Sequence, residues 1–63
     1  MDFIKVYIML DNYTRKLVDS IPRKRKVEQR HQVEQIKKNM ERLKIDNSYI
    51  EAFIEDIKTV CNV

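Results

Sequence analysis

The stretch PRKRKVEQRHQVEQIKKNMERLK, residues 22–44, holds nine Lys or Arg residues and three Glu, and it contains no glycine. A helix advances by about 100° per residue, so Val33, Ile36, Met40 and Leu43 fall on one stripe, with Gln29 in line above them. This spacing predicts a long amphipathic helix whose apolar side is buried.

The cations of this stretch lie mostly on the side away from the apolar stripe. Residues 22–45 carry a charge of +6, residues 1–21 are neutral, and residues 46–63 carry −3. Three interpretations are open. The positive charge attracts the acidic third segment of the same chain or of another subunit, it faces a binding partner, or it is simply exposed to solvent. The candidate nucleic-acid contacts are the following residues: Arg23, Lys24, Arg25, Lys26, Arg30, Lys37 and Lys38.

Two breakpoints divide the chain. In DSIPRK, Ser20 can cap a helix that has Pro22 in its first turn. In KIDNSY, Asp46, Asn47 and Ser48 can all cap, and Ser48 has the capping-box spacing to Glu51. Because the chain has no glycine for tight hairpins, we predict one all-α domain over residues 1–63. Its three helices, at about 2–20, 21–45 and 48–61, form a bundle around the long basic central helix.

The third segment has a wide apolar face. Its members are Ile50, Phe53, Ile54, Ile57, Val60 and Cys61. Its polar side carries Glu51, Glu55 and Asp56, so this helix is expected to pack on the basic helix and to expose carboxylates.

The first segment has more apolar surface than one helix face can bury. As a helix it buries Phe3, Val6, Tyr7 and Leu10 on one side, but Ile4, Ile8 and Met9 lie outside that face. A chain of 63 residues buries only about 60% of the surface that its unfolded form exposes, and a single cysteine excludes an internal disulfide. We therefore expect a homodimer, or a contact with another protein, through Phe3, Ile4, Tyr7, Ile8 and Met9.

An alternative interpretation makes residues 4–10 a strand. The stretch IKVYIML alternates Ile4, Val6, Ile8 and Leu10 with Lys5, Tyr7 and Met9, and Asp11 or Asn12 would then cap the next helix. This pattern resembles the ribbon-helix-helix family of DNA-binding dimers. The resemblance implies that Lys5, Tyr7 and Met9 face the major groove, with an extra helix at the C-terminal end.

Residues 39–56, NMERLKIDNSYIEAFIED, resemble a helix-turn-helix unit in their apolar spacing. However, Lys44 takes the place of the usual turn glycine. The second helix of this unit would also present Glu51, Glu55 and Asp56 to phosphates that repel them. Two antiparallel helices joined by a capped turn explain the same spacing.

The sequence gives little support for catalysis. It has no Gly-rich phosphate loop, and His31 and Cys61 are too few for a zinc site. We therefore expect no enzyme, no cofactor and no metal. Without a run of about 20 apolar residues or a normal signal sequence, and with a lone thiol, a cytoplasmic protein with no membrane contact is expected.

Two classes of function remain. The first is a small regulatory protein that binds DNA or another nucleic acid through phosphate contacts on the basic helix. The alternative is a helical adaptor or inhibitor that docks on a larger protein through its first segment, with Tyr7 and Tyr13.

Overall fold

The computed structural model describes residues 3–63, and within that range it is all-helical. The elements are α1 (Phe3–Met9), α2 (Asn12–Ser20), the 3-10 turn η1 (Ile21–Arg23), α3 (Lys26–Arg42) and α4 (Asn47–Cys61). The all-α prediction is confirmed, but the described residues form four α-helices and not three. No strand occurs among them, so the ribbon-helix-helix alternative is wrong. The expected start of the first helix near residue 2 lies outside the described residues.

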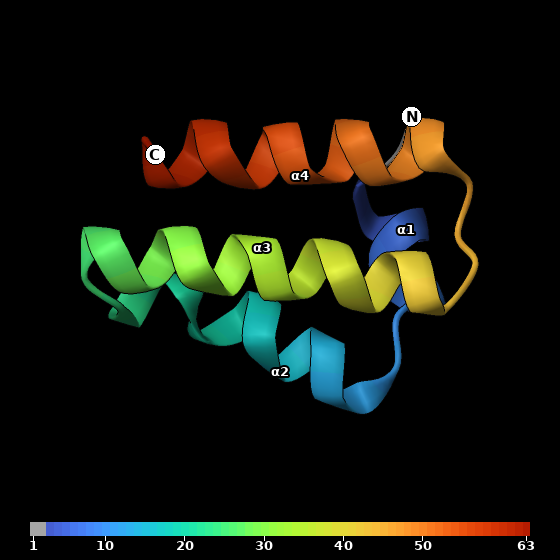
Figure 1. The fold of residues 1–63 in the computed structure, drawn as a ribbon, viewed down its shortest axis with the longest axis horizontal. Helices are drawn as coiled ribbons and strands as arrows, with labels where there is room; N and C mark the ends of the chain where they lie inside the picture. Colours follow the sequence, from blue (N-terminus) through green and yellow to red (C-terminus); the bar gives the residue numbers. More distant parts are fainter. Residues whose placement is uncertain (1–2) are drawn as a thin grey trace.

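The long helix α3 is central, as Figure 1 shows, with α4 along one side of it and α2 along the other. The short helix α1 packs against α4. Because α3 and α4 run antiparallel, the C-terminal end of α4 lies at the same end of the molecule as the start of α3. These two helices therefore form the capped antiparallel pair that was the alternative to a helix-turn-helix unit.

The first segment divides into two helices at Asp11. Its carboxylate accepts a hydrogen bond from the Thr14 backbone N–H (2.9 Å) and caps α2. The Arg15 guanidinium donates to the carbonyl oxygens of Tyr7 (3.3 Å) and Ile8 (2.5 Å), which satisfies the end of α1. A single first helix was expected. Instead, the Asp11 cap and the Arg15 hydrogen bonds end α1 and begin α2 at this point, while Leu10 between the two helices stays buried.

The second breakpoint differs from the expectation as well. The Ser20 hydroxyl donates to the Leu17 carbonyl (3.1 Å) and does not cap a helix. Pro22 lies in the first turn of η1, which anchors the buried Ile21, and α3 begins only at Lys26. Residues 22–25 are therefore a tight turn, and the basic helix is shorter than predicted.

The turn between α3 and α4 uses a different cap from the predicted one. Lys44 has a left-handed backbone (φ 61°), and the Ile45 N–H donates to the Met40 carbonyl (3.2 Å). The Asp46 carboxylate caps α4 by accepting from the Ser48 hydroxyl (2.7 Å) and N–H (2.9 Å). The predicted capping box from Ser48 to Glu51 is wrong because α4 already begins at Asn47, which places Ser48 inside the helix.

One apolar core joins all the helices. Its buried residues are Val6, Leu10, Ile21, Val33, Ile36, Met40, Ile45, Ile50, Phe53, Ile54 and Ile57. The predicted stripe of α3 is confirmed for Val33, Ile36 and Met40, whereas Leu43 is exposed. The predicted face of α4 fails at Val60, whose side chain is 83% exposed, because no element of the described chain covers the outer side of the last turn.

Candidate nucleic-acid interface

The turn between α2 and α3 presents three successive cations to solvent. Ile21 is buried, and the Lys24 N–H donates to its carbonyl (3.0 Å), so this turn is held by its backbone and by one apolar anchor. Arg23, Lys24 and Arg25 follow the anchor, and all three side chains are exposed. The local fold thus gathers these charges in a small area.

Lys26 has a structural role that the sequence did not indicate. Its Nζ donates to the carbonyl oxygens of Cys61 (2.8 Å) and Asn62 (2.9 Å), where α4 ends. A cation at this position satisfies free carbonyl groups and interacts favourably with the negative end of the α4 dipole. Lys26 therefore ties α4 to the start of α3, which brings the end of α4 beside the basic turn.

A second group of cations lies one turn further along α3. Arg30 lines a shallow hollow of about 230 Å³ together with Lys58 from α4, with Glu34 in the same hollow. Lys58 was missed by the sequence analysis because it belongs to the acidic third segment. Its only signal was its place in the last turn of α4, where a cation favours the helix end.

Lys37 and Lys38 lie further along α3, away from the turn that carries Arg23, Lys24 and Arg25. They lie about 20 Å along the helix axis from Arg25, at 1.5 Å per residue. Lys37 lines a second hollow with Glu51, Glu55 and Lys58 of α4, and Lys38 is exposed on α3. Of the seven predicted contact residues, these two therefore lie farthest from the turn, and Lys58 lines both hollows.

We call the group formed by Arg23, Lys24, Arg25, Arg30 and Lys58 the basic end. The segments that carry it, the start of α3 and the last turn of α4, lie at the same end of the molecule in Figure 1. Glu28 and Glu34 are the acidic residues on the same part of α3. The basic end thus combines three segments of the chain into one surface.

The start of α3 is poorly built for helix stability. Its N-cap residue is Arg25, which makes no side-chain hydrogen bond to the helix. Three cations lie beside the positive end of the α3 dipole, where anionic side chains are normally favoured, and Glu28 is the one acidic residue in the first turn. Stability of α3 therefore does not explain the cations of this turn.

The predicted protein interface on α1 is split by the fold. The Phe3 ring stacks on Phe53 at 4.4 Å between centroids, so it packs on the chain's own core. The Tyr7 hydroxyl donates to the Asp19 carboxylate (2.8 Å), and this hydrogen bond raises the pKa of Tyr7. Ile4, Ile8 and Met9 are exposed at 64%, 63% and 49%, so these three lie on the outer face of α1.

Within residues 3–63, no group of three His, Cys, Asp or Glu side chains is placed to hold a metal ion. No helix in that range is long and apolar enough to cross a membrane. Comparison of the chain with family models, curated proteins and solved structures gives no match.

Proposed function

We propose that this chain is a small non-enzymatic protein that binds a nucleic-acid backbone through its basic end. The observation that carries the proposal is the turn of Arg23, Lys24 and Arg25, exposed beside an uncapped helix start. Phosphates neutralise such clusters and release counterions, which favours binding without reading the bases. The proposal includes Lys58 and leaves out Lys26, Lys37 and Lys38.

The test is a salt series of fluorescence-anisotropy titrations with duplex DNA of random sequence. If the five residues of the basic end contact phosphates, the log-log slope of affinity against salt has a magnitude of about 4 to 5. Changing Arg23→Gln together with Arg25→Gln reduces that slope by about 2 and weakens binding equally for different sequences.

The pair Lys37→Gln and Lys38→Gln is the matched control, because it removes the same charge from the same chain at about 20 Å along α3 from Arg25. This variant keeps most of the slope. Absence of salt-dependent binding would refute the proposal. An equal loss in the two double variants would refute the location.

A second candidate function is self-association through the outer face of α1, which the exposure of Ile8 and Met9 favours. The occupant in this case is a second copy of the chain, with α1 packing on α1 across a two-fold axis. Ile8→Asp would then weaken the dimer by at least about tenfold without loss of helix, since a charge would be buried in the contact.

Sedimentation velocity measures this effect. Val27→Asp is the matched control because Val27 is equally exposed (66%) but lies on α3. A stable monomer at micromolar concentration would exclude self-association and would leave the DNA-binding proposal untouched.

A further inference from the structure

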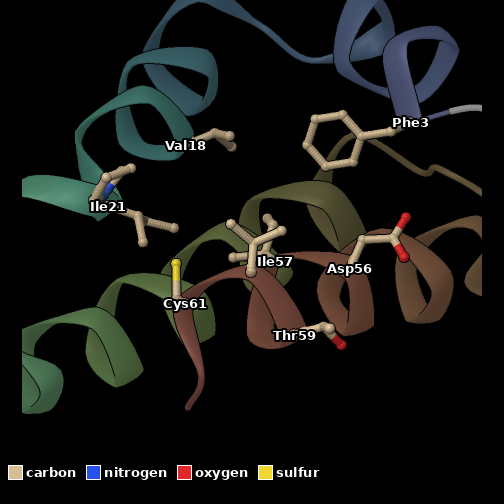
Figure 2. A pocket seen from close by; sticks show the side chains of 9 residues that line it. Phe3, Val18, Ile21, Asp56, Ile57, Thr59 and Cys61 are labelled. Carbon is tan, nitrogen blue, oxygen red and sulfur yellow. The ribbon is translucent and has the colours of Figure 1, made fainter.

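An apolar groove lies between η1 and the last two turns of α4. It has a volume of about 430 Å³ and is lined by Phe3, Val18, Ile21, Ile57, Val60 and Cys61. Figure 2 shows Val18 and Ile21 on one wall, Ile57 and Cys61 on the other, and Phe3 at one end. The surfaces that flank the groove are therefore supplied by α1, α2, η1 and α4.

The groove exists because α1 is too short to cover α4. α1 has 7 residues and α4 has 15, and the contact of α1 with α4 is anchored by Phe3 on Phe53. Ile57 and Cys61 lie one and two turns beyond Phe53 on the same side of α4. The place that a longer helix would fill is left open for about two turns, and the exposed Val60 lies at its rim.

The two ends of the groove differ in charge. Asp56 lines the end near Phe3, as Figure 2 shows. Pro22 lines the groove from η1 and is followed directly by Arg23, Lys24 and Arg25. A helix that enters the groove is best placed with its positive N-terminal end near Asp56 and its negative C-terminal end near the three cations.

We propose that this groove binds one amphipathic helix of another protein, with an apolar stripe of about two turns and acidic residues in its last turn. Helices of this kind dock in grooves through side chains spaced at i, i+3 or i+4, and i+7. The acidic residues would pair with Arg23 and Arg25, which adds electrostatic complementarity to the apolar contact.

A second copy of this chain does not supply such a helix. The outer face of its α1 carries Lys5 and no acid, which would meet the basic end with like charge. Its acidic helix, α4, already uses its apolar face in the core through Ile50, Phe53, Ile54 and Ile57. The charge pattern thus favours a different protein as the partner.

The probe is a fluorescent synthetic helix with a leucine stripe and glutamates in its last turn, and its matched control has lysines in place of the glutamates. We expect the acidic peptide to bind in anisotropy titrations and the lysine peptide to bind at least about tenfold more weakly. The sole cysteine, Cys61, reports the location. A peptide at about ten times its Kd leaves about a tenth of the protein free, so thiol labelling slows about tenfold.

A variant pair tests the groove without changing charge. Val60→Gln places an amide at the rim and weakens peptide binding by about fivefold or more, since apolar contact is lost. Val27→Gln, on another exposed valine, in α3, leaves the affinity unchanged. Both variants keep Arg23, Lys24, Arg25, Arg30 and Lys58, so their binding to DNA tests the proposed function separately.

Three results would overturn this inference. The first is no binding of the acidic peptide, and the second is equal binding of the lysine peptide. The third is slower Cys61 labelling at higher protein concentration without peptide, which would assign the groove to a second copy.

Because Val60 is 83% exposed, a circular-dichroism melt of Val60→Gln is expected to match that of the unchanged chain.

Discussion

The two ends of α3 are built in opposite ways. At the C-terminal end, Ile45 is buried and the Asp46 carboxylate caps the next helix. At the N-terminal end, Arg25 caps nothing and exposed cations crowd the positive end of the dipole. The first end is stabilised by a buried side chain and a carboxylate cap, whereas the second exposes Arg23, Lys24 and Arg25 beside a helix start that has no side-chain cap. That contrast is why we place the binding surface at the basic end.

The largest expected effect is a loss of folding stability from a substitution at the C-terminal end of α3. Ile45→Ala removes a buried side chain, 8% exposed, and should lower the free energy of unfolding by about 2 to 5 kcal/mol. The same truncation at the basic end, Lys24→Ala, should change it by less than about 0.5 kcal/mol because the side chain is exposed. Urea denaturation followed by circular dichroism compares the two. Equal losses would contradict the contrast.

A smaller effect, with the opposite sign, sharpens the contrast. Arg25→Asp gives α3 a side chain that can cap it, since the backbone at this position is already extended (φ −73°, ψ 162°). The free energy of unfolding should rise by about 1 kcal/mol, while DNA affinity falls because one cation becomes an anion. Thermal melts and anisotropy titrations on the same variant measure both. A gain in stability without loss of binding would remove Arg25 from the interface.

The turn between α3 and α4 also stores some strain. Lys44 holds a positive φ that costs a side chain with a Cβ about 1 kcal/mol, so Lys44→Gly should raise the free energy of unfolding by up to that amount. Asn tolerates this conformation better than Lys does, so Lys44→Asn should give a smaller gain. A loss of stability in the glycine variant would show that the Lys44 side chain stabilises the turn.

The smallest expected effect is a loss of folding stability as the pH becomes acidic. Hydrogen bonds from the Ser48 hydroxyl and N–H lower the pKa of Asp46. A carboxylate whose pKa is lower in the folded state stabilises the fold above its unfolded pKa, near 4. This stabilisation is lost as the pH falls through the folded pKa. Asp46→Asn can still cap α4 but cannot titrate, so its melting temperature should fall less on acidification than that of the unchanged chain.

The sequence predicted part of the candidate site and missed the rest for physical reasons. Arg23, Lys24 and Arg25 were found because they are consecutive, so any fold keeps them together. Lys58 was missed because only the antiparallel packing of α4 on α3 brings it to Arg30. Lys26 was assigned to a partner because its two carbonyl acceptors are 35 and 36 residues away in the sequence.

The sequence by itself determined the helical class and the buried stripe of α3, because both follow from local spacing and from the absence of glycine. Tertiary structure decided the rest. The division of the first segment at Asp11 depends on Arg15 reaching back to the carbonyl groups of Tyr7 and Ile8. The basic end and the apolar groove depend on where α4 finishes relative to α3 and α1. Those positions are set by contacts between residues far apart in the chain, which local periodicity does not encode.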